Sequence, residues 1–191
     1  MKLVYQNIFI IAITVLLFGC QSAPIPKPRG YFRLDFPEKQ YKQFDSTFPY
    51  RFLYPVYGKI VKDNQRGAEP FWINIEFPKY KAKFHISYKQ VNGNLDALTE
   101  DIRTLAYKHT IKADAINERQ FVDSKKKVYG ILYDIKGNAA SSFQFYVTDS
   151  TKHFLRGALY FSTHPNKDSL APAIDFFGKD MITLRETLEW K

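Results

Sequence analysis

Cys20 is the only cysteine of the 191-residue chain, and its thiol is the group for which the sequence predicts a reaction most clearly. It follows an unbroken, nearly all apolar run over residues 8–18, which is preceded by one basic residue, Lys2. The run has about the length of the apolar part of a signal peptide, and it is shorter than the roughly 20 apolar residues of a membrane span. The thiol is therefore expected at a membrane surface, as a nucleophile. A single cysteine also excludes an intramolecular disulfide, so the fold must rest on packing.

The stretch Leu17-Phe18-Gly19-Cys20 resembles the lipobox of bacterial lipoproteins, in which a small residue precedes an obligatory cysteine. The resemblance implies that diacylglycerol alkylates Cys20, that the signal peptide of residues 1–19 is removed, and that the new N-terminus is acylated. Each buried methylene contributes about 0.8 kcal/mol, so two or three chains make attachment to membrane lipid effectively permanent. Phe18 departs from the pattern, which usually has a small residue there. A plain secretory peptide, or a short membrane anchor with a chance cysteine, is the alternative.

Residues 20–44 are expected to form a lipidated cysteine, a spacer and an aromatic strip. Alternating prolines favour an extended spacer: Pro24, Pro26 and Pro28. At about 3.1 Å per residue, ten residues reach roughly 30 Å from the membrane. No acid-rich run follows the cysteine, so a periplasm-facing position in the cell envelope is the default expectation.

The segment 26–41, "PKPRGYFRLDFPEKQY", is too aromatic for a pure linker. We predict that it lies across the domain as an edge strand or lid. The alternative is a partner-docking strip formed by Arg29, Tyr31 and Arg33, because arginine and tyrosine are over-represented at binding hot spots.

The rest of the chain predicts no catalytic residues, no metal site, no cofactor and no small-molecule substrate. The histidines are scattered without metal-binding spacing: His85, His109, His153 and His164. No GxSxG motif appears, and lipidation would remove the only thiol from catalysis. A solvated helix face is the expected place of carboxylates such as Glu100 and Asp101. A hydrolase site assembled only in the tertiary structure is the weakest alternative.

The formal net charge of +9 favours contact with anionic surfaces without identifying one. Removal of residues 1–19, which hold one lysine and no acid, would lower this charge by one. The densest basic run, residues 125–127, is expected in a hairpin turn. The alternation "KYKAKFHISYK" could indicate a nucleic-acid surface, but export argues against nucleic acid as a partner. A module that binds peptidoglycan or lipopolysaccharide is the main functional alternative.

The element pattern predicts an α+β fold with a single globular domain over residues 45–191. An antiparallel sheet of about six or seven strands would be packed by two main helices. The order of elements resembles the PsbP-like sandwich. The expected strands are 48–55, 71–78, 79–91, 115–122, 127–136, 141–149 and 153–162, with residues 57–70 as a mobile loop.

The two predicted helices each have an apolar stripe at helical spacing. The first is expected to be capped by Asn94 and to bury five residues: Leu95, Leu98, Ile102, Leu105 and Ala106. The second should cover residues 169–190. Ser169 is its expected cap, and Pro172 is tolerable in the first turn, where backbone amides lack internal partners.

The lipobox, the segment 26–41, "FPYRFLYP", "FWINIEFP" and "LAPAIDFFGKDMITLRETLEW" together resemble the gliding-motility lipoprotein GldD family of the Bacteroidota. The resemblance covers essentially the whole chain. It implies an envelope lipoprotein required for gliding and tied to the type IX secretion machinery. It carries over no catalytic residue, and Cys20 is the one position with a defined chemical role. We therefore expect a non-enzymatic lipoprotein that assembles with or stabilises other gliding and type IX secretion proteins of the envelope.

Overall fold

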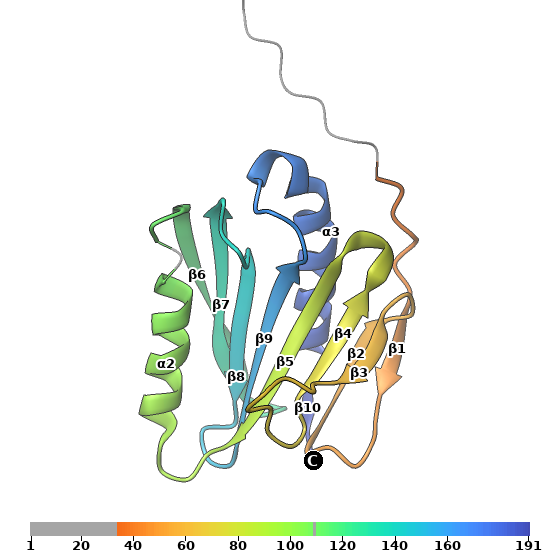
Figure 1. Cartoon of the computed structure of the whole chain (residues 1–191). Coiled ribbons are helices and arrows are strands. Elements are labelled where there is room, and N and C mark those ends of the chain that lie inside the picture. The colour runs from red at the N-terminus through yellow and green to blue at the C-terminus, as the bar shows by residue number, and fades with distance from the viewer. Residues whose placement is uncertain (1–33, 109) are drawn as a thin grey trace, which may run out of the picture. The chain divides into compact units, whose positions relative to one another are not determined.

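The computed structural model describes residues 34–108 and 110–191, and these residues form two antiparallel sheets and two long helices (Figure 1). Four strands precede the first long helix: β1 (Tyr41–Phe44), β2 (Tyr50–Pro55), β3 (Lys59–Lys62) and β4 (Ile73–Phe77). The 3-10 turn η1 (Pro78–Tyr80) and β5 (Ala82–Gln90) then lead to α2 (Leu95–Tyr107). The chain continues through β6 (Ala113–Asp123), β7 (Val128–Gly137), β8 (Phe143–Thr148), β9 (His153–Phe161), α3 (Lys167–Glu186) and β10 (Glu189–Trp190).

The large sheet has seven strands in the order β3-β4-β5-β9-β8-β7-β6, and the small sheet has the order β1-β2-β10. The helices lie on opposite faces of the large sheet, with α2 over β6 to β8 (Figure 1). This confirms the predicted α+β fold of one domain. The small sheet was not foreseen.

Most of the core lies between the large sheet and α3. Phe84 and Leu159 are directly opposite each other on paired strands, so both side chains lie on the face of the sheet that packs against α3. Both are fully buried, and Phe84 packs against Phe177 of α3. Tyr50 and Phe52 of β2 join the same core, so the small sheet is fastened to the domain by apolar packing.

A second core lies under α2. Its buried helical residues are Leu98, Ile102 and Ala106. They pack with Tyr133 and Phe154 from the sheet, among others. Leu105, predicted for this stripe, is instead 38% exposed, because it lies at the margin of the buried face and not at its centre.

Residues 57–70, predicted to be a mobile loop, contain β3. Its four residues pair with β4 from Lys59 opposite Glu76 to Lys62 opposite Ile73. The two glycines and many polar residues of this segment are typical of a loop. An edge strand forms backbone hydrogen bonds with one neighbouring strand only, and polar residues are tolerated there.

The C-terminal helix begins and ends earlier than predicted. Asn166 is the cap of α3, because its Oδ1 accepts the N–H of Ser169 at 3.1 Å. Pro172 therefore lies in the second turn. The helix ends at Glu186, and Glu189 and Trp190 pair with β2 instead of continuing it.

Asn94 occupies the N-cap position of α2 as predicted, but its side chain forms no capping bond to that helix. Its Oδ1 accepts the N–H of Asn92 at 2.8 Å instead. No helix of the described residues is long and apolar enough to cross a membrane.

Candidate functional site

The residues predicted to anchor and dock the protein are Cys20, Arg29, Tyr31 and Arg33, and all four lie outside the described residues. The described residues begin at Leu34, in the middle of the aromatic segment 26–41. Residues 34–44, here called the strap, show how the chain that follows the spacer is attached to the domain. β1 forms the last four residues of the strap and is the edge strand of the small sheet.

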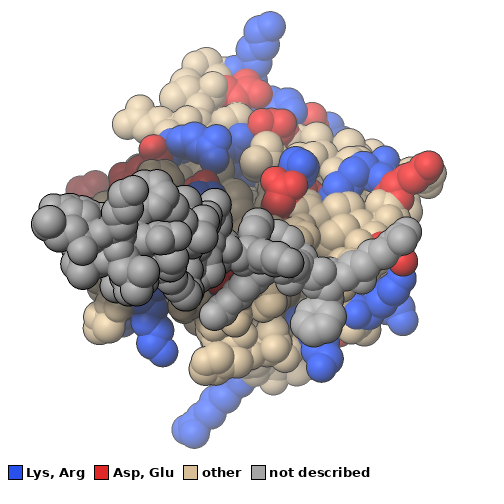
Figure 2. All heavy atoms as spheres, turned by 90° about the horizontal axis from the view of Figure 1, so that it is seen from above, with Lys and Arg blue, Asp and Glu red and all other residues tan. Residues whose placement is uncertain are grey.

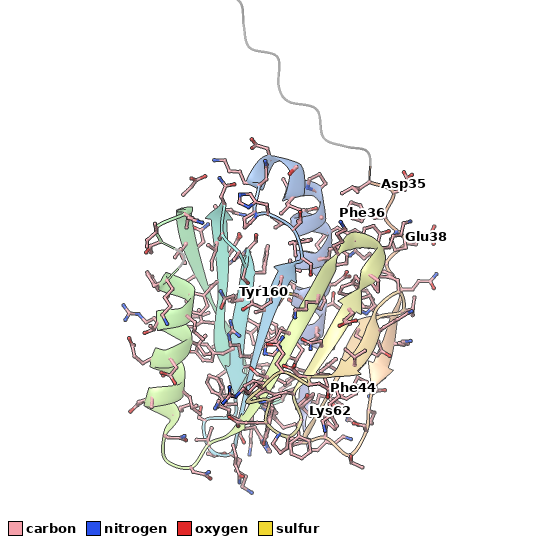
Figure 3. All side chains as sticks on the ribbon, in the orientation of Figure 1. Asp35, Phe36, Glu38, Phe44, Lys62 and Tyr160 are labelled. Carbon is pink, nitrogen blue, oxygen red and sulfur yellow. The ribbon has the colours of Figure 1, made fainter. Side chains whose placement is uncertain are left out.

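The first attachment of the strap is aromatic. The ring of Phe36 stacks on Phe176 of α3, with 4.3 Å between ring centroids and 13° between ring planes. The ring of Tyr80 stacks on Phe36 at 5.4 Å, and its hydroxyl donates to the backbone oxygen of Asp35 at 2.9 Å. Figure 3 labels Asp35 and Phe36 at the start of the strap. Each such aromatic pair contributes about 0.5–1.5 kcal/mol beyond area burial. The aromatic character of this segment is thus explained, from Phe36 onward, by packing on the domain.

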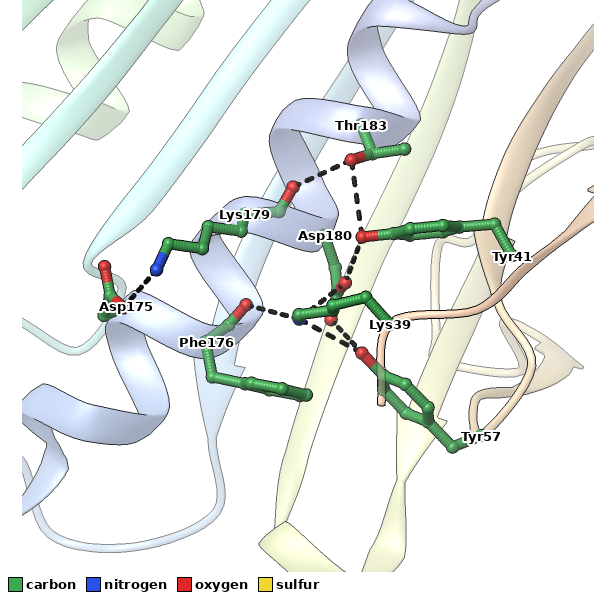
Figure 4. Close-up of polar contacts among 8 residues, drawn as sticks. All are labelled: Lys39, Tyr41, Tyr57, Asp175, Phe176, Lys179, Asp180 and Thr183. Atoms are coloured by element: carbon green, nitrogen blue, oxygen red, sulfur yellow. Dashed lines mark hydrogen bonds and ion pairs between the residues drawn. The ribbon is translucent and has the colours of Figure 1, made fainter. Parts of the chain in front are cut away.

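The second attachment is a buried carboxylate. Asp180 of α3 is fully buried, and its two oxygens accept three side-chain donors (Figure 4). Lys39 Nζ and Tyr41 OH donate to Oδ1 at 2.7 and 2.8 Å, and Tyr57 OH donates to Oδ2 at 2.6 Å. We call these four residues the Asp180 clamp. Lys39 and Asp180 are 141 residues apart in the sequence, so the clamp joins the two ends of the domain.

The charges of the clamp are balanced within it. A buried carboxylate without a partner would cost several kcal/mol, and here a cation and two hydroxyl groups compensate it. Burial lowers the pKa of Lys39, while the hydrogen bond and the charge of Asp180 act in the opposite direction. Burial, followed by the hydrogen bond to Asp180, raises the pKa of Tyr57, which keeps its hydroxyl a donor. Lys39 also donates to the backbone oxygen of Phe176 at 2.8 Å.

The clamp holds no group arranged for nucleophilic or acid–base chemistry on a ligand, because its polar atoms are turned toward one another. The role of the clamp is structural, because it joins the strap to the middle of α3. The third attachment is β1 itself, which pairs antiparallel with β2 over four residues. Tension arriving along the chain from residue 33 would meet the aromatic stack, the clamp and the strand pairing in turn.

The described histidines do not form a shared site. His85 Nδ1 lies 3.1 Å from Asn74 Oδ1 and 3.3 Å from Asp63 Oδ2, and burial lowers its pKa. His153 pairs with the hydroxyl of Tyr88 at 2.8 Å, whereas His109 is outside the described residues. Among the described residues, no three metal-ligating side chains are grouped as an ion would require.

Charged side chains of both signs are interspersed on the end of the molecule seen in Figure 2. Outside the part covered by grey atoms, basic groups do not merge there into one continuous patch. The basic run 125–127 is the β6–β7 hairpin turn, as expected, where Asp123 Oδ1 accepts the N–H groups of Lys125 and Lys126.

Asp180 was not among the predicted site residues, although the sequence contains one signal for it. Phe177, Met181 and Leu184 form the apolar stripe of α3, and Asp180 lies three residues after the first and four before the last. This spacing places the carboxylate on the buried side of the helix. An acid there needs a partner, but the identity of the partner depends on long-range packing.

Comparison with known proteins gives a family and a fold. The model of a family described as gliding motility lipoprotein GldD matches residues 21–190. No curated protein sequence matches the chain. Among solved structures, the solution structure of cyanobacterial PsbP (CyanoP) from Synechocystis sp. PCC 6803 is similar, with a TM-score of 0.52 and 13% identity. The similarity covers 86% of this chain and 100% of that chain, and it confirms the PsbP-like fold predicted from the element order.

Proposed function

The chain belongs to the gliding motility lipoprotein GldD family, and from this membership we propose that it is a non-enzymatic, periplasm-facing partner in the gliding and type IX secretion machinery. The observation that carries the proposal is the extent of the family match, which begins at residue 21 and includes nearly all of the domain. Membership makes the chain a lipoprotein associated with gliding. The anchor at Cys20, the link to secretion and the absence of catalysis belong to the proposal.

The Asp180 clamp supports a role in which the domain is held under load. Lipid chains on Cys20 would hold the start of the segment between the cysteine and the strap in the membrane, and the clamp attaches the end of that segment to α3. The strap would then transmit the position of the lipid anchor to α3 and, through β1, to the small sheet.

Residues 29–33 lie between the spacer and the strap, and the proposal assigns them to partner contact. Phe36 and the residues after it are engaged by the domain. Arg29, Tyr31 and Arg33 precede that engaged part. They would present two cations and an aromatic ring to another envelope protein, which is a composition typical of binding hot spots.

Deletion of the gene tests the proposal at the level of the cell. Gliding and type IX export should both fall, and both should return when the wild-type chain is supplied. A Cys20→Ala chain should fail to restore either, because it would lack the acyl anchor. Normal spreading and normal export in the deletion strain would contradict the role, and full rescue by an unacylated Cys20→Ala chain would contradict the need for the anchor.

A further inference from the structure

The face of the large sheet opposite α3 contains a polar pocket over β5 and β9. Its volume is about 370 Å³, within the range of small-molecule sites. Tyr160 of β9 lies on this face, in the part of the sheet that α2 leaves uncovered (Figure 3). The polar groups at the pocket are Gln65, Lys83, His85, Arg156, Tyr160 and Ser162.

Strand register brings four of these groups together: Lys83, His85, Arg156 and Tyr160. Ser87 pairs with Arg156, His85 with Ala158 and Lys83 with Tyr160, so β5 and β9 present all of them to the same face. The neighbouring strand β8 adds Gln144, which pairs with Ala158. The intervening residues of β9, such as Leu155 and Leu159, face the opposite way into the core under α3.

Arg156 is a buried cation without a counterion. It is 9% exposed, and no carboxylate of the described residues forms an ion pair with it. Its Nη2 donates to Gln144 Oε1 at 2.7 Å and, more weakly, toward Tyr160 OH at 3.4 Å. A buried charge normally has a paired charge of opposite sign, because desolvation otherwise costs several kcal/mol.

Two further donors at this point have no acceptor in the described part of the chain. They are Arg156 Nε and Gln144 Nε2, and both are inaccessible to solvent in the described structure. Native proteins leave few buried polar atoms unpaired, because each one costs about 1–3 kcal/mol. Gln144 is fully buried and Arg156 is nearly buried. Together they bring two unpaired hydrogen-bond donors and one uncompensated positive charge to the same place.

The acids nearest the pocket do not supply the missing charge. Asp63 accepts the N–H of Gln65 at Oδ1, at 3.1 Å, and its Oδ2 faces His85 Nδ1 at 3.3 Å. Glu76 is the cross-strand neighbour of Lys83, but no ion pair joins them in the described structure. Burial lowers the pKa of His85, which makes the ring neutral more often, so Arg156 and Lys83 supply the positive charge.

We propose that this pocket binds a small polar molecule through a phosphate or carboxylate group placed against Arg156 and Lys83. A guanidinium group offers a planar fork of donors that matches such oxyanions, and Tyr160 adds a hydroxyl at the same place. The volume exceeds that of the oxyanion alone, so the ligand carries a body of about the size of a sugar ring. This site is separate from the strap and the Asp180 clamp, so it does not depend on the function proposed above.

Calorimetric titration of the full-length protein in mild detergent tests the site. The probes are inorganic phosphate, a hexose phosphate and a hexuronic acid, with the neutral hexose as the reference. Saturable binding of the charged probes and none of the neutral hexose is expected. The hexose phosphate and the hexuronic acid separate the two sources of the oxyanion, and tighter binding of either one supports the site.

The variants show whether binding uses the pocket. Arg156→Lys keeps the charge but removes the fork, and Lys83→Gln removes a charge at the less buried side of the pocket. Each should weaken binding about tenfold or more, as expected for the loss of a charge-assisted hydrogen bond. Lys152→Gln, in the exposed β8–β9 turn, is the matched control and should leave affinity unchanged. If Arg156→Lys fails to fold, Lys83→Gln and Tyr160→Phe carry the test. The proposal is overturned if no charged probe binds saturably, if the pocket variants bind normally, or if Lys152→Gln weakens binding equally.

Discussion

Replacement of Asp180 by asparagine isolates the charge of the clamp, because the two side chains have nearly the same shape. In the wild-type protein, two donors converge on Oδ1 and one on Oδ2. An amide accepts hydrogen bonds on one side only. In either orientation its NH2 group faces a donor, and Lys39 loses its counterion.

The size of the effect follows from these contacts. A hydrogen bond to a charged group contributes about 1.5–3 kcal/mol, and more than one is weakened here. The Lys39 side chain is 29% exposed and can turn toward water, which limits the loss. We expect the free energy of unfolding to fall by about 2–3 kcal/mol, which lowers the melting temperature by roughly 5–10 °C for a domain of this size.

The assay is thermal unfolding of the full-length protein, followed by tryptophan fluorescence, together with limited proteolysis of residues 34–44. Cleavage in the strap should become faster in Asp180→Asn. The matched control is Asp175→Asn on the same helix, because the exposed pair of Asp175 with Lys179 contributes only about 0.2–0.5 kcal/mol. Equal stability losses in the two variants, or a strap that stays protected in Asp180→Asn, would refute the reasoning.

Two other predictions concern the β-sheet. Burial raises the pKa of Asp149, but the N–H groups of Thr151, Lys152 and His153 lower it more, to about 2. Because the pKa is lower in the folded state, the resulting stability is present above about pH 4 and is lost as the pH falls toward 2. After screening by solvent we expect about 1 kcal/mol, and Asp149→Asn should remove this pH dependence in urea unfolding between pH 2 and 5. A Cβ at Gly130 would lie 1.9 Å from the backbone oxygen of Tyr146, so Gly130→Ala should cost about 3 kcal/mol or more. Gly67→Ala, at φ +90° in open space, should cost only about 1 kcal/mol, and similar losses in these two glycine variants would contradict the close strand approach.

The sequence predicted what depends on local periodicity. Both long helices, β2 and the strands from β4 to β9 were predicted, because alternating or helically spaced apolar residues specify which face is buried. The strands that were missed are short and lie at sheet edges or chain ends. β3 has mostly exposed residues, and β10 consists of two residues whose pairing with β2 is not encoded nearby.

The polar clusters were not predicted, because each needs partners that are distant in the sequence. Asp180 could have been suspected from its place beside an apolar stripe, and Arg156 from the apolar strand around it. Their partners Lys39 and Gln144 have no local feature that indicates a contact. Cys20, Arg29, Tyr31 and Arg33 stay predictions, since they lie outside the described residues.

Site-specific photo-crosslinking in living cells tests the central claim most directly. A photoreactive amino acid at Tyr31 would report what lies next to the segment between spacer and strap. The account predicts capture of a gliding or type IX secretion protein, and loss of that capture in a Cys20→Ala chain. Absence of any captured envelope protein, from a chain that is acylated, folded and able to restore gliding, would contradict it.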